Sequence, residues 1–352
     1  MNKIVEQDIQ TIIADKSIPW EKFRNTSILI TGATGMLPIY ILWTLIYLNE
    51  HEKFNITLYA LVRNRKRAED ILCSYLQKDY LHLLVQDVAE PLQINAPIHY
   101  IIHAASQASP KYYGVDPVGT INANVLGTIN TLNLAREKNV EGYLFFSSGD
   151  VYGIVPPEKF PFNENDYGYI DLLQVHSCYG ESKRMGEQLC VAYDRQYDVP
   201  TKIARIFHTY SPEMLSDDGR VFADFCYSIT RNEDIVLKSE GLAKRLFCYV
   251  TDATRAFFII LLNGNRAEAY NVVNPNGLIS IKELANTLVQ LYPEKKLKVV
   301  VANQREKENK DIIESPIVCA IPQCEKLNKL GWRPSVSIEE GFKRVIEKLS
   351  DD

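Results

Sequence analysis

The chain has 352 residues, of which 46% are hydrophobic and 24% charged, and its 39 Lys and Arg against 44 Asp and Glu give a net charge of −5. This composition excludes a disordered chain, and the acidity argues against a non-specific nucleic-acid binder, because neutralising phosphates requires clustered Lys and Arg. The apolar run 39–48 is about half as long as a bilayer crossing, so no membrane partner is expected. The N-terminus lacks the apolar stretch of a secretory signal, so a cytoplasmic location with reduced thiols is expected. The seven cysteines include no CxxC pair, and we expect no metal site.

The first half of the chain alternates between short apolar runs and helical segments. Residues 1–25 are expected to form an N-terminal helical extension, because Val5, Ile9 and Ile12 fall on one helical face. From Ser27 onward the alternation is typical of βαβ crossovers and a parallel sheet. The expected strands are 27–30, 56–62, 81–86, 100–103 and 143–147, with returns to the sheet at 202–207 and 246–250.

These elements predict an α/β protein with a Rossmann-type doubly wound parallel sheet and a smaller mixed C-terminal lobe that binds substrate. The dinucleotide-binding domain is expected over 26–210, with sheet returns near 246–252. Most of 211–352 is expected to belong to the C-terminal lobe.

A glycine-containing turn follows the first strand and precedes a helix. Its sequence is Gly32-Ala33-Thr34-Gly35, and Met36 and Leu37 come next. Glycines let the backbone approach a pyrophosphate, and a helix N-terminus supplies free N–H groups. We therefore expect the cofactor-binding residues Gly32, Thr34, Gly35, Met36 and Leu37, although Pro38 stands where a third glycine is usual.

The ends of the second and third strands bear on the choice between NAD and NADP. An acidic residue would bind the ribose 2′-hydroxyl of NAD, but Arg63 and Asn64 end the second strand and Arg65 follows. NAD is the expected cofactor, and NADP stays open because Arg63 and Arg65 could hold a 2′-phosphate. Asp87 and Val88 end the third strand and are expected at the adenine.

Tyr179 and Lys183 are one helical turn apart, at positions i and i+4. A free tyrosine has a pKa of about 10 and is a poor base at neutral pH, so a neighbouring ammonium is expected to favour the phenolate. Ser148 follows a strand about 30 residues earlier, at the sheet edge where ligands bind. These residues suit the oxidation of a substrate hydroxyl, with Asp150 close to the same carbon.

Taken together, the motifs resemble the extended short-chain dehydrogenase/reductase family, in its nucleotide-sugar-modifying branch. The matching segments are 31–35, 103–106, Asn124, 147–153, 179–183 and 204–207. The resemblance covers about residues 27–345, nearly the whole chain. It adds Ala104, Ala105, Ser106 and Asn124 to the expected cofactor site.

Within that branch, the segments 86–91, 103–110, 218–221 and 244–250 resemble UDP-glucuronate decarboxylases. Such enzymes oxidise the sugar C4 hydroxyl with bound NAD, release CO2 and return the hydride. The resemblance implies that Tyr179 is the base, that Lys183 is its partner, and that Ser148 positions the hydroxyl. Asp150 takes the place of a family glutamate. The resemblance implies substrate contacts from Ser109, Lys111, Tyr113, His208, Arg220 and Arg245, of which Arg245 lies near the carboxylate.

Other reactions remain open at this stage. A 4-epimerase shares the C4 oxidation, and Asp150 argues against it only mildly. A 4,6-dehydratase would carry an acid at position 149, where this chain has Gly149. A net NADP-dependent dehydrogenase or reductase is favoured by Arg63, and a non-catalytic nucleotide-sensing scaffold is disfavoured by the intact Ser148, Tyr179 and Lys183. A homodimer is expected through the helical segments 117–138 and 178–197.

Overall fold

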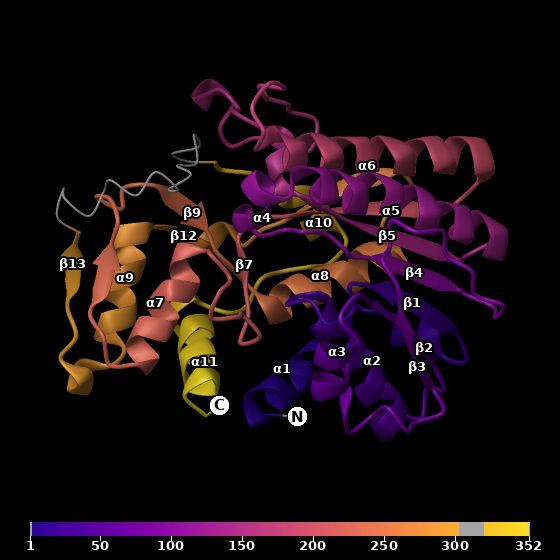
Figure 1. The fold of residues 1–352 in the computed structure, drawn as a ribbon, viewed down its shortest axis with the longest axis horizontal. Coiled ribbons are helices and arrows are strands. Elements are labelled where there is room, and N and C mark those ends of the chain that lie inside the picture. Colours follow the sequence, from indigo (N-terminus) through magenta and orange to yellow (C-terminus); the bar gives the residue numbers. More distant parts are fainter. Residues whose placement is uncertain (1, 303–319, 352) are drawn as a thin grey trace.

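The computed structural model describes residues 2–302 and 320–351. A layered α/β lobe and a smaller lobe formed mostly by later residues stand side by side (Figure 1). The central sheet has seven strands, and every neighbouring pair is parallel. In spatial order the strands are β11 (Glu268–Val272), β6 (Thr201–Ile206), β5 (Gly142–Ser148), β4 (Tyr100–His103), β1 (Ser27–Thr31), β2 (Thr57–Val62) and β3 (Leu81–Val85).

The strand order confirms the predicted doubly wound sheet. The chain builds outward from β1 through β2 to β3, and then returns to β4 on the other side of β1. The chain segments that follow the neighbouring strands β1 and β4 therefore lead into opposite halves of the fold. Open α/β sheets bind ligands at such a point. All five residues of β1 are buried, because helices cover the sheet on both faces.

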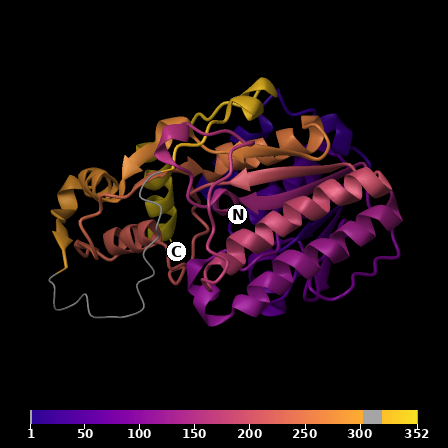
Figure 2. The same ribbon diagram turned by 90° about the horizontal axis from the view of Figure 1, so that it is seen from above.

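Two helical layers enclose the sheet, as Figures 1 and 2 show. One layer packs the larger hydrophobic core and the other packs a separate, smaller core. The first layer contains α1 (Lys3–Ile13), α2 (Pro38–Glu52), α3 (Arg65–Leu72) and α8 (Val250–Asn263). The second contains the long helices α5 (Pro117–Lys138) and α6 (Ser177–Tyr197), which run side by side. Within the described residues, no helix is long and apolar enough to cross a membrane.

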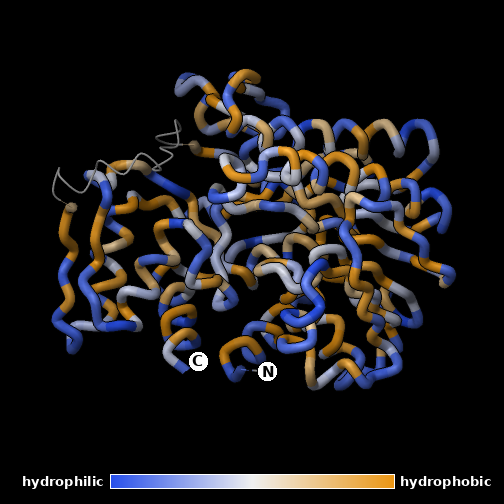
Figure 3. The backbone as a smooth tube through the Cα atoms, viewed as in Figure 1, coloured by the Kyte–Doolittle hydropathy of each residue, from blue (hydrophilic) through white to orange (hydrophobic). Residues whose placement is uncertain are grey.

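The smaller lobe is mixed, as predicted. It is built from three two-stranded sheets, of which one is antiparallel. Their strands are β7 (Thr209–Tyr210) with β10 (Cys248–Tyr249), β9 (Lys244–Leu246) with β12 (Leu278–Ser280), and β8 (Ile235–Leu237) with β13 (Val299–Val301). The helices here are α7 (Val221–Thr230), α9 (Ile281–Gln290) and α11 (Ile338–Asp351), while α10 (Glu325–Lys329) packs on β11 of the central sheet and α4 (Pro110–Val115) precedes α5. Figure 3 shows hydrophobic segments in both lobes, and one apolar core extends through both.

The predicted return to the main sheet at 246–252 is wrong, whereas the return at 202–207 is confirmed as β6. The run 246–250 is apolar because it crosses the shared core, where Phe247 lies 5.3 Å from Phe222 and 5.6 Å from Phe342 between ring centroids. The seventh strand is β11 instead. Its buried Asn271 concealed it in the sequence, since this amide is satisfied by Tyr152 Oη at 2.6 Å and the Gln323 carbonyl at 2.9 Å.

The N-terminal extension is part of the core. Val5, Ile9 and Ile12 are buried as predicted, but the same face of α1 also buries Asp8. Asp8 accepts hydrogen bonds from Tyr40 Oη (2.9 Å), Tyr249 Oη (2.7 Å) and Arg344 Nε (2.9 Å). Burial raises the pKa of Asp8, and the three donors oppose that effect. One carboxylate therefore joins α1, α2, β10 and α11.

Replacing Asp8 with Ala should lower the free energy of unfolding by about 3–5 kcal/mol, because a partly buried guanidinium and two buried hydroxyls lose their acceptor. Urea denaturation followed by circular dichroism measures the change. The matched control is Glu6→Ala, an exposed acid on the same helix, which should change stability by no more than about 0.5 kcal/mol. Equal stabilities of the two variants would contradict the role assigned to Asp8.

Candidate active site

The predicted phosphate turn lies between β1 and α2, at the carboxyl edge of the sheet. Gly32 has φ +64°, and a Cβ there would lie 2.9 Å from Ala105 Cα, so only glycine suits this position. The N–H groups of Met36 and Leu37 donate to no acceptor in the described chain, and Pro38 begins α2, where its missing N–H has no intrahelical use. Free N–H groups at a helix N-terminus suit a pyrophosphate.

Thr31 ties the turn to the end of β4. Its hydroxyl oxygen accepts hydrogen bonds from the N–H groups of Ala104 (3.1 Å) and Ala105 (3.0 Å), and lies 2.8 Å from His103 Nδ1. Burial, with repulsion from Lys183, lowers the pKa of His103 to about 3, so this imidazole is neutral. The predicted residues Ala104 and Ala105 thus face the turn across the switch point of the sheet.

A chain of hydrogen bonds runs from this loop to the catalytic helix. Ser106 Oγ donates to Asn124 Oδ1 at 2.8 Å, and Asn124 Nδ2 donates to Ser182 Oγ at 2.9 Å. Ser182 Oγ in turn donates to the carbonyl of Tyr179 at 2.9 Å. The expected cofactor residues Ser106 and Asn124 therefore lie beside the expected catalytic tyrosine.

Tyr179 and Lys183 share one face of α6, and both are buried. Lys183 Nζ donates to the carbonyl of Phe146 at 2.7 Å and lies 5.7 Å from the centroid of the Tyr179 ring. Burial lowers the pKa of Lys183 to about 7, and the charge of Glu187 opposes this shift. A lysine so poised gains or loses its charge near neutral pH.

The sequence predicts a pKa of Tyr179 below its usual value, but the residues around Tyr179 raise this pKa. Burial raises this pKa, and the negative charge of Asp150 raises it further. Hydrogen bonds with Ser148 and Tyr113, and the charge of Arg220, act in the opposite direction. Desolvation outweighs these contributions, because a buried phenolate loses its hydration.

Tyr113 and Ser148 approach Tyr179 from two sides. The rings of Tyr113 and Tyr179 stack with centroids 4.7 Å apart and planes 15° apart, while Tyr113 Oη donates to the carbonyl of Ala108 at 3.1 Å. Ser148 ends β5, and its Oγ accepts a hydrogen bond from the N–H of Asp150 at 3.1 Å. The predicted base, hydroxyl and substrate tyrosine therefore come together.

Asp150 and His208 form the open part of the site, since both keep contact with solvent although protein surrounds them. Confinement raises the pKa of Asp150, and the charge of Arg245 opposes it. Desolvation by the surrounding protein, with repulsion from Arg245 and Arg220, lowers the pKa of His208. Two guanidinium groups thus act on this part of the site, and their positive charge would attract an anion.

Arg220 joins the smaller lobe to the phosphate turn. Its guanidinium forms a salt bridge with Asp218 and lies 3.3 Å from Met36 Sδ. Ser109 Oγ donates to the carbonyl of Asp218 at 2.7 Å, and Lys111 Nζ binds Asp217 at 2.7 Å. These two expected substrate residues therefore brace the loop before Arg220.

The residues expected at the adenosine end use their side chains locally. Asn64 Oδ1 caps α3 by accepting a hydrogen bond from Arg67 N at 3.0 Å, and Asp87 Oδ1 accepts one from Ala89 N at 2.9 Å. Arg65 forms an exposed ion pair with Glu69 at 3.4 Å, while Arg63 is exposed and acts on Asp116. The Val88 side chain packs on α5, where a Cβ at Gly127 would come within 2.8 Å of it, and the Thr34 carbonyl accepts a hydrogen bond from Arg67 at 3.3 Å.

Sequence reasoning missed a buried ion pair behind Lys183. Glu187 Oε2 lies 2.7 Å from Arg205 Nη2, and Glu187 Oε1 accepts hydrogen bonds from Arg205 Nε (2.9 Å) and Ser147 Oγ (2.5 Å). Arg205 also donates to Tyr152 Oη, Tyr167 Oη and the Glu164 carbonyl. Glu187 follows Lys183 by one helical turn, and that spacing is the signal that could have identified it.

Comparisons with known proteins agree with this geometry. The NAD dependent epimerase/dehydratase family matches residues 28–274. UDP-glucuronic acid decarboxylase 6 of Arabidopsis thaliana is 33% identical over 326 residues, which are 92% of this chain and 88% of that relative. UDP-glucuronic acid decarboxylase 1 of Danio rerio is 30% identical over 94% of this chain and 74% of its own length.

Solved structures share the fold at lower identity. The UDP-glucose 4-epimerase of Thermotoga maritima with UDP-glucose gives a TM-score of 0.75 at 20% identity, covering 93% of this chain and 99% of that one. The UDP-glucuronic acid 4-epimerase of Bacillus cereus, in complex with UDP-glucuronic acid and NAD, gives 0.72 at 17% identity with the same coverage.

Replacing Glu187 with Gln should move the titration of Lys183 to lower pH, because the carboxylate charge that opposes the lowering of this pKa is removed. The buried guanidinium of Arg205 also loses its counter-ion, so the free energy of unfolding should fall by about 3 kcal/mol. Carbon-13 NMR of labelled lysine side chains measures the titration midpoint.

Two further variants serve as controls for this measurement. Glu187→Asp keeps the charge and should move the Lys183 midpoint back toward that of the unchanged protein. Glu181→Gln, on the same helix but paired with the less buried Arg184, should leave the midpoint in place. A Lys183 titration that is identical in the unchanged protein and in Glu187→Gln would contradict the coupling.

Proposed function

Because the chain belongs to the NAD dependent epimerase/dehydratase family, we propose that it is a nucleotide-sugar decarboxylase that acts on a UDP-glucuronate-like substrate. The observation that supports the proposal is that the charge of Asp150 acts on the buried Tyr179, while the charge of Arg245 acts on Asp150. This set combines a proton acceptor, a second acid–base group and a cation for the sugar carboxylate. The identity with UDP-glucuronic acid decarboxylases over more than nine-tenths of the chain supports the same substrate class.

The residues present fit a dinucleotide. The Gly32 turn leaves no room for a Cβ, and the free N–H groups of Met36 and Leu37 would hold the pyrophosphate. Lys183 would hold the nicotinamide ribose. NAD, when bound, supplies the oxidant that takes a hydride from the sugar C4 and returns it. We propose NAD, with NADP as the alternative that Arg63 supports.

Tyr179 would carry out the first proton transfer. In its phenolate form, hydrogen-bonded with Ser148, it would accept the proton of the C4 hydroxyl as that carbon loses its hydride to the nicotinamide and becomes a ketone. Ser148 would hold the hydroxyl in line with the phenolic oxygen, and the stacked Tyr113 would fix the ring. The charge of Lys183, 5.7 Å from the ring centroid, would stabilise the phenolate.

The decarboxylation step would use the polar groups of the smaller lobe. The 4-keto acid loses CO2 as the C5–C6 bond breaks and its electron pair passes to the C4 carbonyl, which becomes an enolate. Arg245 would orient the carboxylate before this step. Asp150, whose pKa confinement raises, would then give a proton to C5 and restore the ketone.

Gly149 disfavours the dehydratase alternative. A Cβ at this position would lie 2.6 Å from the Phe207 ring, so an acidic side chain fits there only if Phe207 moves. The 4-epimerase alternative shares every residue of the C4 oxidation and is separated from the proposal by its product. A net dehydrogenase would release the reduced cofactor instead of recycling it.

The outer faces of α5 and α6 support the proposal of a homodimer. Exposed apolar residues include Val118 (65% exposed) and Leu126 (43%) on α5, and Met185 (49%) and Val191 (39%) on α6. These helices lie side by side on the outside of the sheet (Figure 2). Self-association would cover them, as exposed apolar patches often require. The six cysteines among the described residues are free thiols, which supports the proposal of a cytoplasmic location.

Mass spectrometry of the products formed from UDP-glucuronate, UDP-glucose and UDP-galactose tests the reaction. Loss of CO2 from UDP-glucuronate is expected, and Tyr179→Phe should lower this turnover by about 10³-fold, because the proton acceptor is removed. Asp150→Asn should still oxidise C4 in a single turnover but form the final product slowly, because C5 is protonated slowly. A product of unchanged mass with inverted C4 would establish epimerisation. Loss of water would establish dehydration, and a gain or loss of two hydrogens would establish net redox.

Met185→Glu should convert the expected dimer, of twice 40.2 kDa, into a monomer, because it places a charge in the apolar face of α6. Light scattering coupled to size-exclusion chromatography measures the mass. Val300→Glu changes a similarly exposed apolar residue (40%) on β13, in the other lobe, and should leave the dimer intact. Equal masses of all three proteins would refute the α5–α6 interface.

A further inference from the structure

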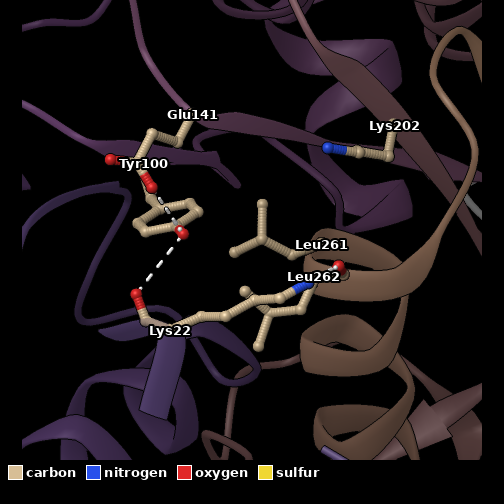
Figure 4. A pocket seen from close by; sticks show the side chains of 6 residues that line it. All are labelled: Lys22, Tyr100, Glu141, Lys202, Leu261 and Leu262. Carbon is tan, nitrogen blue, oxygen red and sulfur yellow. Dashed lines mark hydrogen bonds between the residues drawn. The ribbon is translucent and has the colours of Figure 1, made fainter. Parts of the chain in front are cut away.

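A cavity lies at the opposite end of the central strands from the residues of the candidate active site. It has a volume of about 330 Å³ and opens at the amino ends of β4, β5 and β6, beside the carboxyl end of α8 (Figure 4). Its lining residues are Lys22, Tyr100, Glu141, Lys202, Leu261 and Leu262. Nothing in the proposed reaction uses this cavity.

Lys202 is the unusual residue of this cavity. It is the second residue of β6 and only 7% exposed, yet its ammonium has no hydrogen-bond or ion-pair partner among the described residues. Figure 4 shows its side chain directed into the space between Tyr100 and Leu261. Burial lowers the pKa of Lys202 to about 8, with repulsion from Arg266 and Lys22 in the same direction and Asp194 opposing it. A buried cation without a partner is unfavourable unless a ligand supplies one.

The other charged groups near the cavity have partners. Lys22 Nζ donates to the carbonyl of Leu262 at 2.9 Å, near the end of α8. The Glu141 carboxylate accepts a hydrogen bond from Tyr100 Oη at 3.0 Å. Arg266 forms ion pairs with Asp194 at 2.8 Å and with Asp198 at 2.5 Å. Lys202 is therefore the one charged group among these whose side chain has no hydrogen-bond partner in the described part of the chain.

We propose that this cavity binds a small monocarboxylate with a short apolar chain. The carboxylate would pair with Lys202 and take the place of the water that its ammonium has lost. The apolar chain would lie against Leu261, Leu262 and the Tyr100 ring, which form the hydrophobic part of the lining. A single negative charge suits the site, because Lys202 is the lining cation whose ammonium lacks a hydrogen-bond partner among the described residues, and Glu141 would repel a second anionic group.

Hexanoate is the probe for this site, and differential scanning calorimetry measures its effect on the intact protein. The protein is first saturated with UDP, so that the anion-binding residues of the active site are occupied. Hexanoate should then raise the melting temperature by about 2 °C at saturation, compared with sodium chloride of equal ionic strength. An equal effect of the uncharged hexanol would overturn the proposal, and so would a hexanoate effect that is present without UDP and absent with it.

The variants separate binding by Lys202 from a general effect of the probe. Lys202→Met should melt at a higher temperature than the unchanged protein, because a buried unpaired charge is removed, and should no longer respond to hexanoate. Lys202→Arg keeps the charge and should keep the response. The control Lys298→Met removes an exposed lysine of the other lobe and should respond like the unchanged protein. A full hexanoate response in Lys202→Met would overturn the proposal.

Discussion

The active site depends on one desolvated cation, the ammonium of Lys183. It donates a hydrogen bond to the carbonyl of Phe146 on β5, and this contact links the face of α6 that carries Tyr179 to the sheet. A charge in such a place would be unfavourable on its own. Glu187 compensates for it from one turn along the helix, and Arg205 compensates in turn for Glu187. The helix that carries Tyr179 and Lys183 is therefore held by a series of coupled charges as well as by apolar packing.

The smaller lobe contributes a second set of charges, from Arg220 and Arg245. Desolvation, with repulsion from Arg245 and Arg220, lowers the pKa of His208, while Arg220 also reaches Met36 in the phosphate turn. In the proposed function, the positive groups for a nucleotide diphosphate and for a sugar carboxylate would come from one lobe, and the proton acceptor would come from the other. Binding of the substrate and its chemistry would then be divided between lobes that share a single hydrophobic core.

Much of this arrangement could be predicted from local sequence, because the parallel sheet, the Gly32 turn and the Tyr179–Lys183 pair are each encoded within a few residues. The strand β11 could not, since Asn271 is buried only because partners distant in sequence satisfy its amide. The run 246–250 misled for the opposite reason, as tertiary burial and not sheet pairing makes it apolar. The balance of effects on the pKa of Tyr179 also depends on desolvation, which the spacing of residues does not reveal.

The hydrogen bonds of the Asp8 carboxylate have a consequence for folding during translation. Its partner Tyr40 emerges soon after it, but Tyr249 and Arg344 lie 241 and 336 residues further along the chain. During translation, α1 therefore cannot complete its hydrogen bonds until Arg344 has left the exit tunnel. Its apolar face stays without its final partners until then, which makes this helix a segment for chaperones to shield.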